Sequence, residues 1–566
     1  MAQPQPSTST LFTNANIFLS GVSPGTNAGL HRPPTFASSL LVRDDRIVFV
    51  GSSSAPEVTA ALSDPQTTGH DLHGKTLLPG FVDGHMHLMM MGQSLNKLDL
   101  GKCKTLADIR SAISAHAKAT PIAPRILARG WMHSMTPGGV SAADLDGLDI
   151  PGSDRPILID TKDLHSTWCN TPGLVELSAD SWPDVPGGTI ERDSNGKPTG
   201  VFSEAANITY VWPHLAQVAS MEERVAAIRS AVEVYHKEGY TGLIDMAMDD
   251  GSWEALQAYR AAGGEIPMRI AAYWLIRPGK TTEENLAQVE RAIELAKVYS
   301  AQKTPDCRIV GVKVICDGII DACTAGLTEP YAHNDHMEVP LWTEEQLEPV
   351  VKRADEAGLQ VALHAIGDAT IKMVIDVLEK YVSPERRPRV EHIELASEED
   401  AARLGKGRIT ASIQPVHADP AILRAWPKLL GEHRCGRAFA YREFSDYGAP
   451  LALGSDAPTA PHSPLGNVYV GTTRRSYREP AYEATVNPHF ALGLCESVAA
   501  GTEGAAYSCF DDGRIGVLKA GHKADFVVVD MEWEKEKLTE AKVIETWYNG
   551  ARVFSSEGAQ AAANRI

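Results

Sequence analysis

Short apolar runs alternate with amphipathic segments through about 400 residues in the middle of the chain. Runs such as TGLIDMAM, RIVGVKVICDG and LQVALHAIG have the length and the β-branched content of buried strands. Between several of them lie segments with apolar positions at helical spacing, for example MEERVAAIRSAVEVYHKEG and TEENLAQVERAIELAKVYSAQ. Repeated strand–helix units predict an α/β fold, a TIM-like (β/α)8 barrel, in which chemistry takes place at the C-terminal ends of the strands.

The two ends of the chain have a different pattern. Residues 1–80 contain short strand-like runs, including SLLVRDDRIVFVG with a turn at its two aspartates, and residues 506–566 are also β-rich with glycine turns. We therefore expect both termini to form a small β-sandwich domain beside a barrel of residues 81–505. Proline and glycine interrupt every pattern in the stretch 92–235, which we interpret as an insertion covering the barrel mouth.

Composition narrows the class of protein. The chain has 566 residues, 53 Lys+Arg against 72 Asp+Glu, and a formal net charge of −19, which argues against a nucleic-acid partner. No apolar run is long enough to span a bilayer, and the N-terminus lacks the pattern of a secretion signal, so we expect a cytoplasmic protein without membrane contact. The eight cysteines have no CxxC spacing, which favours reduced thiols. A homodimer fits, because dimers are the commonest soluble assembly.

The triplet His85-Met86-His87, in LLPGFVDGHMHLMM, is the most informative local feature. On a strand, side chains two residues apart project to the same face, so both imidazoles can bind one metal ion. Such a pair is common by chance and is weak evidence alone. Polar residues at the ends of four later apolar runs strengthen it: Lys313, His364, His392 and Asp456.

Lys313 lies within an otherwise apolar run, where a charged ammonium group is costly to bury. Burial lowers the pKa of the lysine and favours a neutral amine. Such an amine can react with CO2 to form a carbamate, which supplies two oxygen ligands to metal ions. The alternative is a buried lysine paired with Asp317 or Glu391, and the sequence does not choose between the two interpretations.

His364 and His392 are each flanked by apolar residues, as expected for ligands at strand ends. A lone histidine in such a run is more often a hydrogen-bonded core residue, but two of them together with the His85/His87 pair favour a metal site. Imidazoles and a carboxylate are suited to zinc or a similar divalent ion. Asp456 can bind metal and also accept a proton from the attacking water, which makes it the candidate general base.

Several ordered motifs resemble those of the amidohydrolase superfamily, and within it amidohydrolase family 3, the YtcJ-like branch that includes N-substituted formamide deformylases. The matching segments extend over nearly the whole chain: PGFVDGHMHL, VGVKVICDG, VALHAIGDA, RVEHIE, SIQPVHA, LALGSDAP and GRIGVLKAGHKADFVVVD, with LIDTKDLHSTWCN and VPGGTIERDSNGKPTGVFSE in the insertion.

The resemblance implies a (β/α)8 barrel with a β-sandwich and a metal centre. His85 and His87 would bind one ion, His364 and His392 a second, a carboxylated Lys313 would bridge them, and Asp456 would act on the nucleophilic water. Members of the family differ in metal number, so one or two ions, most simply zinc, are expected.

Further pocket residues follow from the same resemblance. His165, in KDLHSTWCN, would stabilise the oxyanion or bind substrate. Trp131, Trp168 and His417 are candidates for the pocket wall, although a structural role explains each equally well. Two departures from the family pattern concern substrate identity: Ala457 stands where a tryptophan often follows the aspartate, and DGIIDACTAG lacks the small-residue and arginine pattern often found there.

The sequence thus predicts a metal-dependent hydrolase that cleaves a non-peptide C–N bond, an amide or formamide, in a small organic molecule. Deamination of a cyclic amidine, or ester or lactone hydrolysis, is the alternative within enzymes, because the same activated water can attack any of these carbons. A metal-free scaffold or binding protein is the alternative from another class. It predicts the loss of ligands, and all six are present.

Overall fold

The computed structural model describes residues 9–20, 33–152, 154–161, 166–185, 188–204, 206–263 and 266–558. The chain divides into two compact units. The first comprises Met1–Leu88, Val232–Asp249 and Gly263–Ile566, and the second comprises Met89–Ala231 and Asp250–Ala262. The barrel strands and the terminal sheets all belong to the first unit.

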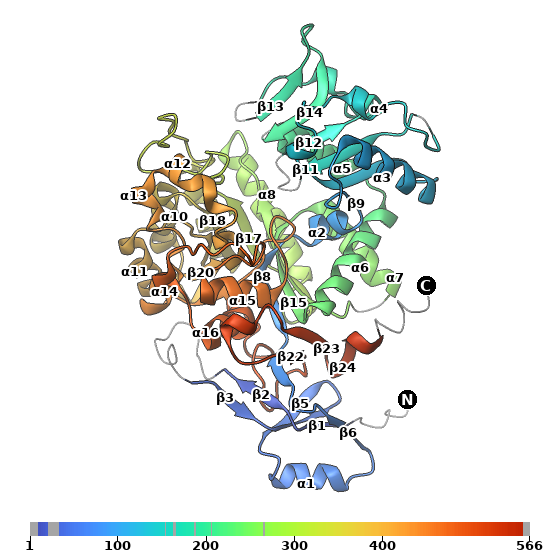
Figure 1. Cartoon of the computed structure of the whole chain (residues 1–566). Coiled ribbons are helices and arrows are strands. Elements are labelled where there is room, and N and C mark those ends of the chain that lie inside the picture. The colour runs from blue at the N-terminus through green and yellow to red at the C-terminus, as the bar shows by residue number, and fades with distance from the viewer. Residues whose placement is uncertain are drawn as a thin grey trace. The chain divides into compact units, whose positions relative to one another are not determined.

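Eight parallel strands form the central sheet of the first unit, in the order β21-β20-β19-β18-β17-β16-β15-β8. Figure 1 labels β8, β15, β17, β18 and β20. Each strand of this sheet is hydrogen-bonded to the strand of the sheet that follows it in the sequence, whereas the first and last strands, β8 and β21, are not paired as a ladder. This is the barrel that the alternating pattern predicts. The strands are β8 (Phe81–Met86), β15 (Tyr240–Met248), β16 (Arg269–Ile276), β17 (Cys307–Ile315), β18 (Gln360–Ala365), β19 (Arg389–His392), β20 (Thr410–Ile413) and β21 (Leu451–Leu453).

Helices connect successive strands, as a (β/α)8 barrel requires. Thr281 and Thr343 cap two of them at the N-terminus, because each hydroxyl accepts a hydrogen bond from a backbone N–H of the first turn. The two helices predicted from the sequence are confirmed as α6 and α8. The helices that precede, separate or follow these strands along the chain are α6 (Met221–Lys237), α7 (Asp250–Gly263), α8 (Thr282–Val298), α9 (Glu344–Glu356), α10 (Asp368–Tyr381), α11 (Glu398–Lys406), α12 (Trp426–Leu430), α13 (Glu432–Cys435), α14 (Tyr441–Asp446), α15 (Pro464–Thr473), α16 (Leu494–Ala499) and α17 (Ala505–Ser508).

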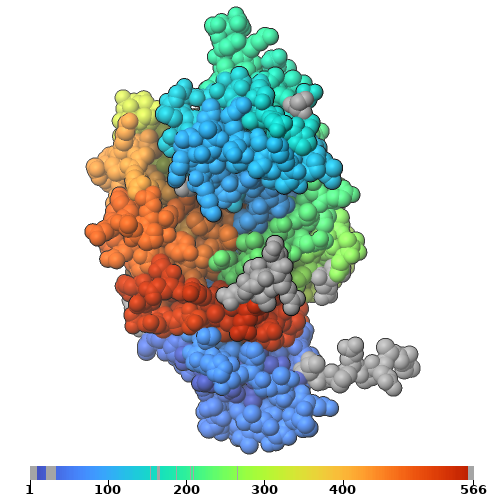
Figure 2. Space-filling model, turned by 45° about the vertical axis from the view of Figure 1, so that its right-hand side comes forward, coloured from blue at the N-terminus to red at the C-terminus, as the bar shows by residue number. Residues whose placement is uncertain are grey.

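Strands from both ends of the chain form two further sheets, with the orders β5-β4-β1-β6 and β24-β23-β22-β7-β2-β3. Their inner faces share one core, in which Phe12 meets Phe526 and Trp547 edge-to-face. The N-terminal part, in blue, accordingly lies against the C-terminal segment, in red (Figure 2). The predicted sandwich is therefore confirmed. Its strands are β1 (Ser9–Thr13), β2 (Asn16–Leu19), β3 (Thr35–Ala37), β4 (Ser39–Arg43), β5 (Arg46–Gly51), β6 (Thr67–Asp71), β7 (Thr76–Pro79), β22 (Phe526–Asp530), β23 (Lys542–Tyr548) and β24 (Ala551–Ser555).

The second unit contains a mixed sheet of six strands, in the order β13-β14-β12-β11-β10-β9. Much of it falls in the stretch where proline and glycine obscure the sequence pattern. That this insertion covers the barrel mouth stays a prediction. Its strands and main helices are α2 (Leu88–Leu95), β9 (Leu98–Asp99), α3 (Leu106–Ala119), β10 (Ile126–Trp131), β11 (Ile157–Thr161), β12 (Ser166–Cys169), α4 (Thr171–Leu177), β13 (Gly188–Arg192), β14 (Pro198–Glu204) and α5 (Trp212–Val218).

Helix length and hydropathy also bear on membrane association. Within the described ranges, none of the helices combines the length and the apolar character needed to cross a bilayer.

Candidate metal centre

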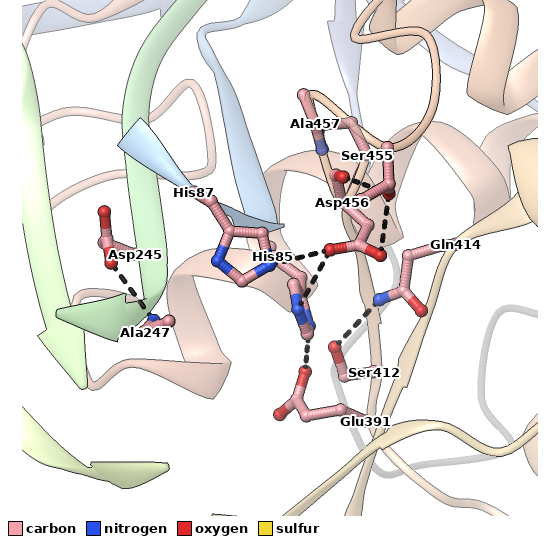
Figure 3. Close-up of polar contacts among 12 residues, drawn as sticks. His85, His87, Asp245, Ala247, Glu391, Ser412, Gln414, Ser455, Asp456 and Ala457 are labelled. Atoms are coloured by element: carbon pink, nitrogen blue, oxygen red, sulfur yellow. Dashed lines mark hydrogen bonds and ion pairs between the residues drawn. The ribbon is translucent and has the colours of Figure 1, made fainter. Parts of the chain in front are cut away.

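The six residues that the sequence predicts as metal ligands lie at or near the C-terminal ends of five barrel strands. His85 and His87 lie at the end of β8, Lys313 on β17, His364 on β18 and His392 at the end of β19, while Asp456 follows β21. Parallel strands in a barrel end at the same face, so this placement gathers residues that are distant in the sequence. Figure 3 shows His85 and His87 directed towards the Asp456 carboxylate.

The barrel closes where β8 meets the end of β21. The amide of Asp456 donates to the carbonyl of His85 (2.7 Å), and the amide of His87 donates to the carbonyl of Ala457 (2.9 Å). The backbones approach so closely that a Cβ on Gly454 would lie 2.4 Å from the amide nitrogen of His85. Backbone pairing therefore sets the separation between the histidine pair and Asp456.

A buried network behind this closure holds the same two segments. The carboxylate of Asp83, on β8, accepts hydrogen bonds from the Ser455 amide (2.8 Å), the Ser455 hydroxyl (2.6 Å) and the Tyr235 hydroxyl (2.9 Å). Burial raises the pKa of Asp83 to about 6, although these hydrogen bonds oppose the shift. Asp83 precedes His85 by two residues and Ser455 precedes Asp456 by one, so the network holds together the two backbone segments that carry His85 and Asp456.

Asp456 is the centre of the cluster. Its Oδ1 lies 3.0 Å from Nε2 of His87 and 3.4 Å from Nε2 of His85, and its Oδ2 lies 3.5 Å from Nε2 of His417. Burial alone would raise the pKa of Asp456, but the hydrogen bond with His87 and the neighbouring histidines hold it well below its ordinary value. The carboxylate is therefore ionised at neutral pH.

Three histidines of the cluster, His85, His364 and His392, have lowered pKa values and are therefore neutral near pH 7. Burial and the charge of Lys313 lower the pKa of His85 to about 4 and that of His364 to about 3, and burial holds the pKa of His392 well below its ordinary value. The His392 ring centroid lies 4.8 Å from that of His85 and 4.4 Å from that of His364. Neutral imidazole is the form that binds a metal ion.

Two groups of side chains could each hold a metal ion: His85, His87 and Asp456, and His392, His417 and Asp456. The second group contains His417, which the sequence analysis suggested only as part of the pocket wall. The resemblance implied His364 in this place. The Nε2 of His364 faces the Gly318 carbonyl at 3.4 Å and Asp317 Oδ1 at 3.6 Å. His364 nevertheless packs against His392 within the same cluster.

Buried polar atoms without a partner also point to a bound ion. Among the described residues, Nδ1 of His87, Nδ1 of His392 and Nζ of Lys313 are buried and have no hydrogen-bond partner. A buried polar atom normally has a partner, so three such atoms in one cluster fit a site that takes up a ligand or ordered water. The donor set, imidazole with carboxylate, suits a divalent ion such as zinc.

Lys313 is only 1% exposed. Burial lowers its pKa to about 8, against the opposing charges of Glu391 and Asp456. The two carboxylates suggested as its ion-pair partners are engaged elsewhere. Asp317 accepts the amides of Gly326, Ile366 and Gly367, whereas Glu391 binds arginine and histidine side chains. The amine of Lys313 is thus buried and has no direct hydrogen-bond partner among the described residues.

Two glutamates, Glu391 and Glu394, contact histidines of the site, and the sequence analysis did not predict these contacts. Glu391 accepts a hydrogen bond from Nδ1 of His85 (2.7 Å), and Glu394 contacts Nδ1 of His417 (3.2 Å). Burial alone would raise the pKa of Glu391, but Arg389 and His85 hold it well below its ordinary value. The signal in the sequence is the spacing of two glutamates around His392 in RVEHIEL.

Two of the remaining predicted pocket residues, both tryptophans, lie in the second unit. Trp131 and Trp168 are 1% and 0% exposed and belong to its hydrophobic core, with ring centroids 5.3 Å apart. Their indole N–H groups donate to Thr136 Oγ1 and to the Ser141 carbonyl. This is the structural role weighed for both residues. His165 lies outside the described residues.

An eight-stranded parallel barrel with a histidine–aspartate cluster at its strand ends defines a class of barrel hydrolases. The model of one family, described as the amidohydrolase family, matches residues 69–554, and the chain belongs to this family. The predicted enzyme class, an amidohydrolase, is therefore confirmed, as is the resemblance stated from the motifs.

Individual relatives agree with this assignment. The chain is similar to the putative amidohydrolase YtcJ of Bacillus subtilis, with 29% identity over 85% of this chain and 89% of the relative. It is also similar to the N-substituted formamide deformylase of Arthrobacter pascens, with 24% identity over 92% and 96%. A solved structure, an uncharacterized metal-dependent hydrolase from Pyrococcus horikoshii, has the same fold (TM-score 0.74, 22% identity, 93% and 98% covered).

Proposed function

We propose that this chain is a metal-dependent hydrolase that cleaves the amide or formamide bond of a small organic molecule. The observation that carries the proposal is the ionised, buried carboxylate of Asp456, contacted by histidines on both of its oxygens at the barrel's strand ends. The similarity to a formamide deformylase supports a non-peptide C–N bond as the target.

One or two divalent ions, zinc foremost, would be held by His85, His87 and Asp456 and by His392 and His417 with Asp456. Such an ion lowers the pKa of a water molecule towards neutrality and polarises a carbonyl group. The buried, unpartnered Nζ of Lys313 is suited to carry a carbamate, which would add two oxygen ligands.

The protein's own groups would move the proton. Because Asp456 is ionised, it can accept a proton from the attacking water and deliver it to the leaving nitrogen. Its position is held by the backbone bonds to β8 and by the Thr459 hydroxyl, which donates to Oδ2 (3.0 Å). The lowered pKa of His85, His364 and His392 keeps these rings neutral near pH 7, the form in which an imidazole binds a metal ion.

Metal analysis combined with a substrate screen tests the proposal. We expect about one or two equivalents of divalent metal per chain, and release of carboxylate or formate with an amine from a panel of small amides and formamides.

Ammonia release from cyclic amidines would favour a deaminase, and turnover confined to esters or lactones would favour an esterase. Absence of metal, even after reconstitution with divalent ions and bicarbonate, would favour the scaffold alternative. Location in the cytoplasm and assembly as a homodimer stay predictions.

A further inference from the structure

His85 is held from behind by a chain of buried charged groups. Its Nδ1 lies 2.7 Å from Glu391 Oε2, and the Arg389 guanidinium donates to both Glu391 oxygens (2.8 and 3.1 Å). Arg389 also donates to the carbonyl of Gly84, the residue before His85 (2.7 Å). Arg389 and Glu391 are both fully buried. The same guanidinium therefore fixes the backbone before His85 and the carboxylate that binds its ring.

This contact decides which ring nitrogen of His85 carries the hydrogen. An ionised carboxylate only accepts hydrogen bonds, so the neutral ring carries its hydrogen on Nδ1. The lone pair of Nε2 then points towards Asp456 Oδ1, at 3.4 Å. Two acceptors facing each other repel, and a cation bound by both relieves this repulsion. Glu391 thus prepares His85 as a metal ligand.

His417 has a similar pair of contacts at the other oxygen of the Asp456 carboxylate. Its Nδ1 lies 3.2 Å from Glu394 Oε1, and its Nε2 lies 3.5 Å from Asp456 Oδ2. Glu394 and Asp456 are nearly fully buried, so water competes little for these contacts. Each oxygen of the Asp456 carboxylate is therefore approached by a histidine whose far nitrogen is held by a glutamate.

Both glutamates come from one short segment at the end of β19. Between them, His392 and Ile393 have φ angles of +75° and +53°, a left-handed conformation that is uncommon for residues other than glycine. The strand alternation is broken there, so Glu391, His392 and Glu394 can all serve one site. Backbone strain of this kind persists where the surrounding structure imposes it, often at functional sites.

We propose that Glu391 and Glu394 are positioning residues of the metal centre, each orienting one histidine, His85 or His417, towards Asp456. The inference rests on the proposed metal-dependent function and adds that a single segment, residues 391–394, prepares both ion positions. A carboxylate behind a metal-binding histidine typically contributes about 10- to 100-fold to metal affinity.

The test is equilibrium binding of Co²⁺ and Zn²⁺ to the metal-depleted full-length protein, measured by competition with a chromophoric chelator and by the visible spectrum of bound Co²⁺. We expect Glu391→Gln and Glu394→Gln each to weaken binding about 10- to 100-fold and to change the Co²⁺ spectrum. Glu391→Asp and Glu394→Asp, which keep the carboxylate, should recover part of the affinity.

The matched control is Asp511→Asn, which removes another buried carboxylate paired with an arginine, Arg308 (3.2 Å). It should lower the melting temperature while leaving metal affinity unchanged. Should Glu391→Gln fail to fold, Arg389→Lys leaves Glu391 in place but cannot make all of the arginine's contacts, and it should weaken Co²⁺ binding to a smaller extent.

Wild-type affinity and an unchanged spectrum in a folded Glu391→Gln or Glu394→Gln variant would overturn the role of that glutamate. Failure of the proposed hydrolase function has a different signature: a wild-type protein that binds metal tightly, loses it in these variants, and cleaves none of the amides or formamides. The two failures are therefore separable.

Discussion

Two sets of buried residues, one in each unit, were candidates for the active site on sequence grounds, and they differ in how their polar atoms are satisfied. In the second unit, the indole N–H groups of Trp131 and Trp168 both have protein acceptors. In the barrel, His87, His392 and Lys313 each keep a buried polar atom without a partner in the described parts of the chain. Burial is common to both sets, so it does not by itself distinguish the site from the core; the difference is that the indole groups are hydrogen-bonded within a core, whereas the three open atoms of the barrel belong to candidate ligands.

The largest expected effect is on the acid–base group of the barrel cluster. Asp456→Asn removes the proton acceptor while keeping the shape of the side chain, so we expect kcat to fall by about 10²–10⁴-fold or more with little change in melting temperature. Steady-state kinetics and thermal unfolding measure the two effects. Asp400→Asn, a buried carboxylate on α11, is the control and should keep full activity. Full activity in Asp456→Asn would refute the assigned role.

Lys313→Ala tests whether the unpartnered amine of the barrel serves the metal. We expect the affinity for metal at the bridged position to fall by roughly tenfold or more, so that the purified variant contains less metal. Added acetate or propionate should restore part of the metal content, because their oxygens can replace those of the carbamate. Elemental mass spectrometry of the purified variant gives the metal content. Lys523→Ala, which removes a lysine paired with Asp45, is the control. Unchanged metal content in Lys313→Ala would exclude a bridging carbamate.

The two tryptophans of the second unit, whose indole N–H groups are hydrogen-bonded, should affect stability rather than metal binding or activity. Trp131→Phe and Trp168→Phe each remove an indole hydrogen bond within the core of the second unit, so we expect a loss of about 1–3 kcal/mol in the free energy of unfolding. Metal content and kcat/KM should stay at wild-type values. A drop in kcat/KM without any change in stability would instead place the altered tryptophan in the substrate pocket.

The smallest expected effect concerns a fully paired charge cluster away from the site. Asp306 binds Arg269 and Arg514, and although burial opposes the shift, these arginines hold its pKa below its ordinary value. A lowered pKa in the folded state means that its stabilisation is present above the unfolded pKa, near 4, and is lost as the pH falls through the folded value. In Asp306→Asn the free energy of unfolding should therefore fall less between pH 7 and pH 3 than in the wild type, by about 1 kcal/mol or less. Urea unfolding between pH 3 and pH 7 measures this, and an unchanged pH profile would contradict it.

Much of the barrel could be predicted because its signals are local. A run such as RIVGVKVICDG has the composition and length of a buried strand wherever it lies, and β17 is found there as Cys307–Ile315. The second unit could not be predicted in the same way. Its strands β13 and β14 pair across a turn within a stretch rich in proline and glycine, where local preference and hydrophobic period carry little information.

The candidate ligands themselves follow from residue type and strand position, whereas their partners do not. Glu391 meets His85 across 306 residues of sequence, and Asp456 meets His87 across 369. The left-handed backbone at His392 and Ile393 breaks the alternation on which a strand-based reading depends, so the sequence could not show that Glu391 and Glu394 both serve the site.

The sequence by itself determined the alternation of strands and helices in the barrel, the family, and the residue types that a hydrolytic metal centre requires, because periodicity and motifs depend on neighbouring residues. Only the tertiary structure decided which histidine faces which carboxylate oxygen, that His417 joins the cluster, and that Trp131 and Trp168 belong to a core. These outcomes depend on contacts between distant segments and on whether each buried polar atom has a partner, and both are settled only when the barrel closes at Gly84 and Gly454.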